Sequence, residues 1–257
     1  MLLAFDIGNT NINAGVFQGE WLRATWRMAT SVHRLADEYA IILLGLLQNR
    51  DISAGEIKEV VICSVVPPLT ETFESLAQQY WGVSPLVVEA GVKTGVRIQM
   101  ENPREVGADR VVNAAAAHRL YGGPLIVIDM GTATTFDAVS KDGDYLGGAI
   151  APGIGIAAEA LFQRTAMLPR VEMVRPSRAI GKNTAMAIQS GIVFGYSGLI
   201  EGVVSRIKHE MGGQVKVVAT GGLAQVMARE TPVIDVVNLD LTLHGLRLVY
   251  EMNKVVK

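Results

Sequence analysis

Two short acidic segments carry the residues of this chain best suited to chemistry. Asp6 follows an apolar run and precedes Gly8, and Asp129 stands in the same way before Gly131. Each segment ends a buried strand with a carboxylate and then supplies a glycine, whose missing Cβ lets backbone amides approach an anion closely. This pattern is typical of phosphate and metal chemistry.

The two segments repeat each other along the chain. They stand 123 positions apart, and at that offset Asn11 aligns with Thr134 and Val16 with Val139, so the similarity continues into the following strand. We therefore expect a duplicated protein with two lobes, residues 1–117 and residues 118–257, each of a usual domain size.

Composition limits the classes of function. Hydrophobic residues make up 49% of the chain and charged residues 19%, which excludes a disordered protein. A net charge of −2 without a cluster of Lys and Arg gives no general attraction to a polyanion, so we expect no nucleic-acid partner. The single cysteine, Cys63, excludes an intrachain disulfide, and its place after an apolar run favours a buried strand residue over a thiol nucleophile.

The sequence also predicts neither a signal peptide nor a membrane-spanning segment. Asp6 interrupts the first apolar residues, no basic segment precedes them, and the apolar stretch Ala40–Leu47 is too short to cross a bilayer. We expect a cytoplasmic protein without a membrane partner.

The apolar periodicity predicts the elements that position the acidic segments. In the first half it predicts strands and helices in the order β-β-β-α-β-α-β, over residues 2–5, 12–17, 21–28, about 35–46, 60–63, 69–80 and 86–88. An alanine-rich helix follows over 109–121, near the predicted boundary. The second half repeats the theme with strands over 125–129, 134–139, 145–150 and 215–219, and with helices over about 183–211 and 241–253.

Other familiar motifs fit poorly. Gly181 and Lys182 do not form a P-loop, because Pro176 occupies the position of its first glycine and Asn183 that of its hydroxyl residue. Gly153–Ala158 matches a short dinucleotide-binding pattern, but Pro152 directly precedes it and chance matches are common. The histidines are too scattered for local metal-ligand spacing: His33, His118, His209 and His244.

Four motifs, in order and spacing, resemble the signatures of type III pantothenate kinases. They are Asp6–Thr10, Gly107–Arg110, Asp129–Thr134 and Gly148–Gly153, and Thr220–Gly222 is similar to the adenosine-side loop of that family. The resemblance covers essentially the whole chain. It implies an α/β fold of two duplicated ribonuclease-H-like domains, as in actin and the sugar kinases, with an interlobe ATP cleft.

For the nucleotide, the resemblance implies ATP as phosphoryl donor, with Mg²⁺ linked to Asp6. The implied phosphate-binding residues are Asp6, Ile7, Gly8, Asn9, Thr10, Asn11, Ile12 and Asn13. It also implies that Asp129 holds a monovalent cation, K⁺ or NH₄⁺, and that Thr132 contacts ATP. The glycine turns contain no Lys, so a cation there would offset triphosphate charge. A polar hairpin turn is the simpler interpretation of the first segment, but its repeat at Asp129 argues against that.

Asp109 is the candidate general base. It lies where a helix begins, so a helix N-cap is the alternative role. Amide donors and the neighbouring Arg110 predict a lowered pKa for this carboxylate, which would make it a weak base. We therefore expect late proton removal, because a loose phosphoryl-transfer transition state demands little early activation of the nucleophile.

On the substrate side, the resemblance places Gly107, Ala108, Asp109, Arg110 and Thr184 near pantothenate. The Arg110 guanidinium can bind a carboxylate with two hydrogen bonds, and an ion pair with Glu105 is the alternative. Thr184 could instead cap a helix. Met100 stands where many family members carry Tyr, so one hydroxyl contact to the substrate is missing, although Met can pack against an alkyl chain.

These residues predict an ATP-dependent kinase that converts pantothenate to 4′-phosphopantothenate, the first step towards coenzyme A. Two alternatives are a kinase of the same fold for another small alcohol such as a sugar, and a nucleotide-binding regulatory protein without turnover. Retention of Asp6, Asp109 and Asp129 argues against the second alternative. By resemblance alone, we also expect a homodimer.

Overall fold

The chain forms two compact units in a computed structural model that describes residues 1–254. The first unit contains Met1–Val96, Glu101–Ala116 and the chain from Asp240 onward, and the second contains Arg97–Met100 and Ala117–Leu239. The expected division into 1–117 and 118–257 differs from these units at Arg97–Met100, which belongs to the second unit, and in the last helix, which packs on the sheet of the first unit.

The first unit is built on a five-stranded mixed sheet. Its strand order is β3-β2-β1-β4-β5, in which β1 pairs antiparallel with β2 and parallel with β4. The strands are β1 (Leu2–Ile7), β2 (Asn11–Gln18), β3 (Trp21–Ala29), β4 (Glu59–Ser64) and β5 (Leu86–Val87). A parallel pair next to a meander requires a crossover connection, which the helix α1 supplies between β3 and β4.

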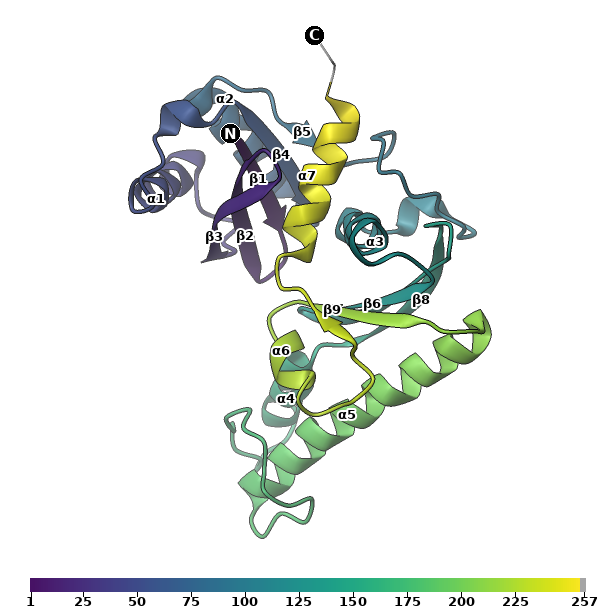
Figure 1. Ribbon diagram of the computed structural model, residues 1–257. Helices are drawn as coiled ribbons and strands as arrows, with labels where there is room; N and C mark the ends of the chain where they lie inside the picture. The colour runs from purple at the N-terminus through teal and green to yellow at the C-terminus, as the bar shows by residue number, and fades with distance from the viewer. Residues whose placement is uncertain (255–257) are drawn as a thin grey trace. The chain divides into compact units, whose positions relative to one another are not determined.

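Helices cover both faces of this sheet (Figure 1). α1 (Ala36–Gln48) and α2 (Pro67–Trp81) bury Tyr39, Leu43 and Phe73 against Phe5 and its neighbours on one face. On the other face, α7 (Leu241–Asn253) buries Leu243, Leu246 and Val249 among strand residues, together with Val112 of α3 (Ala108–Tyr121). Two short 3₁₀ helices, η1 (Ala54–Glu56) and η2 (Pro103–Glu105), complete the unit.

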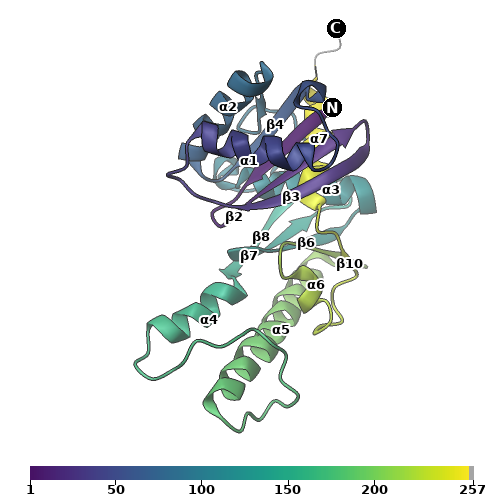
Figure 2. The ribbon, with the colours of Figure 1, turned by 90° about the vertical axis from the view of Figure 1, so that its left-hand side faces the viewer.

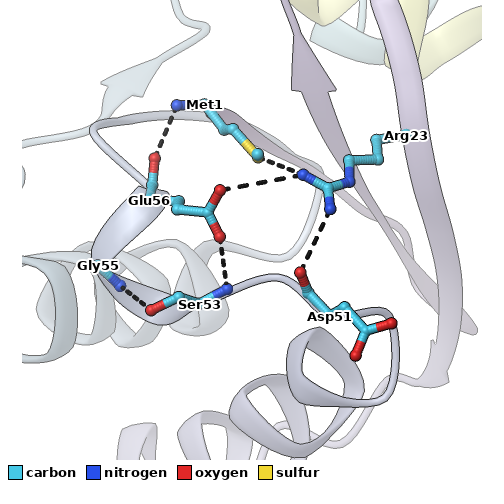
Figure 3. Close-up of polar contacts among 6 residues, drawn as sticks. All are labelled: Met1, Arg23, Asp51, Ser53, Gly55 and Glu56. Atoms are coloured by element: carbon cyan, nitrogen blue, oxygen red, sulfur yellow. Dashed lines mark hydrogen bonds and ion pairs between the residues drawn. The ribbon is translucent and has the colours of Figure 1, made fainter.

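A polar cluster fixes the edge of the first unit around η1 (Figure 3). Arg23 of β3 donates to the Asp51 carbonyl at 3.3 Å and lies 3.9 Å from the Glu56 carboxylate. Glu56 also accepts from the Ser53 N–H at 2.8 Å, and its carbonyl accepts from the Met1 amino group at 2.7 Å. These contacts hold the start of β1, at the opposite end of that strand from Asp6.

The second unit repeats the same sheet. Its strand order is β10-β9-β6-β7-β8, which matches the first order when each strand is replaced by its counterpart five strands later. The strands are β6 (Leu125–Met130), β7 (Ala133–Val139), β8 (Tyr145–Pro152), β9 (Lys216–Thr220) and β10 (Val236–Val237). β1 and β6 even share one burial pattern, in which only the aspartate position is not fully buried. The predicted duplication is confirmed.

The register corrects the predicted alignment in one detail. Ile7 pairs with Ile12 across the first turn, whereas Met130 pairs with Thr134 across the second. The second turn is therefore one residue shorter, and beyond it the counterpart of Val139 is Phe17, not Val16. The offset that aligns the two acidic segments does not extend through the following strand.

Three helices lie on one face of the second sheet: α4 (Ile154–Gln163), α5 (Thr184–Met211) and α6 (Ala224–Met227). Figure 2 shows α4 and α5 below that sheet. By length and composition alone α5 could cross a membrane, and its buried residues Tyr196, Ile200 and Val204 join the core over the sheet. The patterns missed α4, α6 and the two-residue strand β10.

Candidate functional site

Asp6 lies at the carboxyl end of β1, directly opposite Asn13 of β2. The Asn13 Nδ2 donates to Asp6 Oδ2 at 2.9 Å. The turn after Asp6 is closed by the Gly8 N–H, which donates to the Asn11 carbonyl at 3.0 Å, and a Cβ on Gly8 would lie 3.1 Å from that oxygen. The side chains of Asn9, Thr10 and Asn11 are exposed on this turn. The turn is thus a fixed loop with exposed polar groups beside a carboxylate.

The strand β3 supports the same turn from outside. The Thr30 hydroxyl, just beyond β3, donates to the Gly8 carbonyl at 2.6 Å, and the Thr30 N–H donates to the Thr10 carbonyl at 3.0 Å. Both contacts engage carbonyl groups of the turn, and they hold its backbone in one position.

Asp109 lies in the first turn of α3. Its Oδ1 accepts a hydrogen bond from the Arg110 N–H at 2.8 Å. A Cβ on Gly107 would come within 2.6 Å of the same Oδ1, so the glycine leaves room for the carboxylate in this position. Glu105, the alternative ion-pair partner considered for Arg110, accepts from Asn102 Nδ2 at 2.8 Å.

Asp6 and Asp109 share one electrostatic environment in the first unit. Burial raises the pKa of Asp6 to about 6, the Asn13 hydrogen bond lowers it in part, and the charge on Asp109 raises it further. Cys63, which pairs with Asp6 in the β1–β4 register, is buried, and burial together with the charges of Asp6 and Asp109 holds its thiol pKa well above the usual value. A neutral, buried Cys63 does not act as a nucleophile.

The predicted lowering of the Asp109 pKa was wrong. Burial is the largest influence and raises the pKa of Asp109 above its usual 3.8, while the Arg110 N–H and guanidinium offset only part of that rise. The sequence showed the two donors, but it did not show how much water the fold removes from the carboxylate. A raised pKa makes Asp109 a stronger base than expected.

Sequence patterns missed the support that α7 gives to α3. The Thr242 hydroxyl of α7 donates to Asn113 Oδ1 at 2.8 Å, one helical turn after Asp109. A Cβ on Gly245 would lie 2.4 Å from the Val112 carbonyl, so the glycine lets the two helices approach closely. These contacts fix the helix that carries Asp109, and no local motif marks them.

In the second unit, Asp129 lies at the carboxyl end of β6, opposite Thr220 of β9. Gly221, with φ of +91°, stands against it, because a Cβ there would lie 2.7 Å from Asp129 Oδ1. The Gly153 N–H donates to the Thr132 carbonyl at 3.0 Å, and a Cβ on Gly153 would lie 2.2 Å from that oxygen. The structure therefore joins three of the sequence motifs around this turn.

The remaining predicted residues of the second unit lie elsewhere. Thr184 is the first residue of α5 and is exposed; Asn183 is the helix cap, and its Oδ1 accepts from the Met186 N–H at 2.8 Å. Thr184 is therefore not the cap. Met100 is partly buried, and a Cβ added at Gly147 of β8 would lie 4.0 Å from its Cγ.

Within residues 1–254, no group of three or more His, Cys, Asp or Glu side chains is placed to hold a metal ion. A cation at Asp6 or Asp129 would need its other ligands from backbone oxygens, water or a bound phosphate. This donor set suits Mg²⁺, which usually keeps several waters and is bound by one or two carboxylates together with substrate phosphates.

Solved structures with this architecture define the fold class. An inorganic polyphosphate/ATP-glucomannokinase from an Arthrobacter strain aligns with a TM-score of 0.54 at 16% identity, covering 98% of this chain and 99% of its own. A conserved Campylobacter jejuni protein assigned to the Baf family of transcriptional activators aligns with a TM-score of 0.64 at 20% identity, covering 98% of both chains. The fold is the duplicated ribonuclease-H-like α/β fold of actin and the sugar kinases, as predicted.

Sequence comparison defines the family. The family model described as type III pantothenate kinase matches residues 2–206. A type III pantothenate kinase of Dehalococcoides mccartyi strain CBDB1 is 57% identical over 254 residues, covering 99% of this chain and 97% of its own length. One of Moorella thermoacetica is 56% identical over 253 residues, covering 98% of this chain and all of its own. The chain belongs to the type III pantothenate kinase family.

Proposed function

We propose that this protein transfers the γ-phosphoryl group of ATP to the primary hydroxyl of pantothenate, giving 4′-phosphopantothenate and ADP in the first step of coenzyme A synthesis. The single observation that carries the proposal is the pair of carboxylates in the first unit, Asp6 and Asp109, in a family named for this reaction. One carboxylate suits a phosphate-bound cation and the other suits the removal of a proton.

Asp109 is the general base in this proposal. Its raised pKa lies closer to neutral pH than that of an ordinary aspartate, yet the Arg110 N–H and guanidinium still favour the ionised form. In the reaction the hydroxyl O–H bond breaks towards Asp109 while the hydroxyl oxygen bonds to phosphorus. The bond from the γ-phosphorus to the bridging oxygen breaks, and ADP leaves with that electron pair. Because the transition state is loose, Asp109 orients the hydroxyl first and accepts its proton late.

Asp6 and the turn after it bind the phosphates of ATP with Mg²⁺ in this proposal. The residues are Asp6, Ile7, Gly8, Asn9, Thr10, Asn11, Ile12 and Asn13. The fit is favourable because burial and the Asp109 charge make an ionised Asp6 costly without a cation, and a divalent ion would reverse that penalty. When bound, Mg²⁺ neutralises charge on the phosphates.

In the second unit, we assign Asp129 to a monovalent cation, K⁺ or NH₄⁺, and Thr132 to a contact with ATP. The support is structural: Gly221 packs against the Asp129 carboxylate and the Met130 backbone, and the Gly153 N–H donates to the Thr132 carbonyl at 3.0 Å. A fixed cation next to a triphosphate stabilises its charge without the lysine that other kinases use.

For pantothenate, we assign the carboxylate to Arg110 and further contacts to Gly107, Ala108, Thr184 and Met100. Gly107 and Ala108 immediately precede the base, and Thr184 presents an exposed hydroxyl at the start of α5. Met100 offers a flexible apolar side chain where a tyrosine would offer a hydroxyl.

We further propose a cytoplasmic homodimer. Several large apolar side chains of the second unit are exposed, on β8, on α4 and on the segment that follows it, and a second copy would remove them from water. They are Leu146, Ile150, Ile156, Phe162, Met167, Val174 and Ile180.

A coupled assay tests the function directly. Purified protein is supplied with ATP, Mg²⁺ and either pantothenate or a hexose panel, with K⁺ replaced by Na⁺ in a parallel series. We expect ADP production with pantothenate only, stimulated by K⁺. Phosphorylation of a hexose without pantothenate turnover would support a sugar kinase, and no ADP production with any acceptor would support a regulatory protein.

A further inference from the structure

One tyrosine of α5 reaches the nucleotide-side turn of the second unit. Tyr196 is 6% exposed, and its hydroxyl forms two hydrogen bonds. One is with the Thr134 hydroxyl, and the other, at 3.0 Å, is with the Pro152 carbonyl. Thr134 itself is 1% exposed at the end of the turn that follows Asp129. A single phenol therefore joins α5, β7 and the end of β8.

The proton positions in this small network follow from the groups present. A carbonyl oxygen can only accept, so the Tyr196 proton goes to Pro152, and the Thr134 hydroxyl supplies the proton of the contact between the two hydroxyls. Burial raises the pKa of Tyr196, which keeps the phenol protonated throughout the working pH range. Each of the three groups therefore has a defined role as donor or acceptor, and this chain of hydrogen bonds fixes their relative positions.

The residues that Tyr196 contacts flank Thr132. Pro152 pairs with Ala133 in the β7–β8 register, and the next residue, Gly153, donates its N–H to the Thr132 carbonyl at 3.0 Å. We propose that Tyr196 is a positioning residue for the nucleotide side of the reaction, whose hydroxyl holds the Asp129–Thr134 turn against the end of β8. This inference rests on the roles proposed for Asp129 and Thr132.

A tyrosine is not needed here for packing alone. The Tyr196 ring lies in the apolar core with Ile200 and Val204, where a phenylalanine ring would fill the same volume. The hydroxyl adds only the two polar contacts at the turn. Removing it leaves the buried Thr134 hydroxyl without this partner and breaks the link to the Pro152 carbonyl, which belongs to an exposed residue, and the turn is then free to shift.

The test compares Tyr196→Phe with wild type in steady-state assays that vary ATP, K⁺ and pantothenate separately. We expect the KM for ATP and the half-saturating K⁺ concentration to rise by roughly 5- to 30-fold, the effect of one lost buried hydrogen-bond partner, while the KM for pantothenate changes less than about twofold. Thr134→Val should give the same split, and Thr134→Ser, which keeps the hydroxyl, should restore most of the wild-type values.

Tyr121→Phe is the matched control, because its hydroxyl accepts from Asn238 Nδ2 at 2.9 Å in the same unit but outside the turn. This control should leave all three constants unchanged. A Tyr196→Phe protein that loses thermal stability but keeps the wild-type constants, or that shifts the ATP and pantothenate constants equally, overturns the inference. If Tyr196→Phe does not fold, the comparison of Thr134→Val with Thr134→Ser tests the inference in its place. Wild-type protein that does not phosphorylate pantothenate would instead reject the proposed function.

Discussion

The charge on Asp109 raises the pKa of Asp6, although one residue ends the first strand and the other lies in the first turn of α3. A buried carboxylate whose ionised form is disfavoured by a second carboxylate is costly, so a fold that keeps such a pair suggests a cation and a proton acceptor. The roles proposed for these two carboxylates, for the Asp129 turn and for Met100 lead to four testable predictions.

Asp109→Asn should lower kcat by at least tenfold, and up to about 10⁴-fold, because a positioned base contributes about that much to a proton-transfer step. Asparagine keeps an oxygen that can accept from the Arg110 N–H, so the circular dichroism spectrum and melting temperature should stay close to wild type. The kcat of this variant and of wild type, measured from pH 5 to 9, checks the role.

The pH profile provides a second check. Only the ionised base accepts a proton, so wild-type kcat should fall as the pH drops through the raised pKa of Asp109, and the residual rate of Asp109→Asn should lack that fall. Asp142→Asn, at an exposed aspartate in the β7–β8 turn, is the control and should behave as wild type. Near-normal turnover of Asp109→Asn would remove the base assignment.

Asp6→Asn should inactivate the enzyme and stabilise the ligand-free fold at neutral pH. The pKa of Asp6 rises from 3.8 to about 6 on folding, so the folded state binds the proton more tightly and Asp6 costs stability as the pH rises through that range. Melting temperatures without nucleotide or Mg²⁺ should therefore be similar for both proteins near pH 4 and higher for the variant at pH 7. A variant that is less stable than wild type at pH 7 would contradict the expectation that the ionised Asp6 carboxylate lowers the stability of the ligand-free fold.

Gly221→Ala should impair activation by K⁺. The added methyl would lie 2.7 Å from Asp129 Oδ1 and from the Met130 backbone N and C atoms, and a φ of +91° is unfavourable for alanine, so the carboxylate and the backbone next to it must move. We expect the half-saturating K⁺ concentration to rise at least about tenfold, equivalent to about 1.4 kcal/mol of lost binding. Gly191→Ala on α5, where a methyl meets nothing within 4 Å, is the control. An unchanged dependence of the rate on K⁺ concentration would contradict the assignment of Asp129 as a ligand of the cation.

Met100→Tyr should change the KM for pantothenate more than the KM for ATP. Met100 is partly buried beside β8, and tyrosine restores the hydroxyl expected there from the family resemblance. Initial rates with each substrate varied in turn measure both constants, and Met167→Tyr, at a side chain that is 91% exposed, controls for the added ring. A larger effect on ATP would mean that Met100 lies on the nucleotide side.

Sequence reasoning found the sheets and the repeat because the signals are local. Short apolar runs such as Val60–Cys63 and Leu125–Ile128, rich in β-branched residues, are typical of buried strands, and an aspartate followed by a glycine marks the turns after β1 and β6. It missed α4 because that helix directly follows an edge strand and its segment is rich in small residues, which blur the periodicity. It also misaligned the repeat beyond the turn, since only strand pairing reveals that the second turn is one residue shorter.

The chemistry of single side chains was less predictable than the motifs. The donors next to Asp109 are visible in the sequence, but the burial that outweighs them comes from helices and strands distant in the chain. Tyr196 reads as one more apolar position of a long helix, because its partners Thr134 and Pro152 belong to another part of the sequence. Gly221 likewise looks like half of a glycine pair in the sequence, and its positive φ and its close approach to Asp129 and the Met130 backbone are visible only in the structure.

The sequence by itself determined the duplicated α/β plan, the acidic turns and the family, because strand periodicity, turn chemistry and motif spacing are properties of neighbouring residues. Only the tertiary structure decided the proton affinities of Asp6 and Asp109 and the contacts that hold the Asp129 turn. Those depend on which groups the fold brings together and how much water it removes, and both are set by packing between segments far apart in the chain.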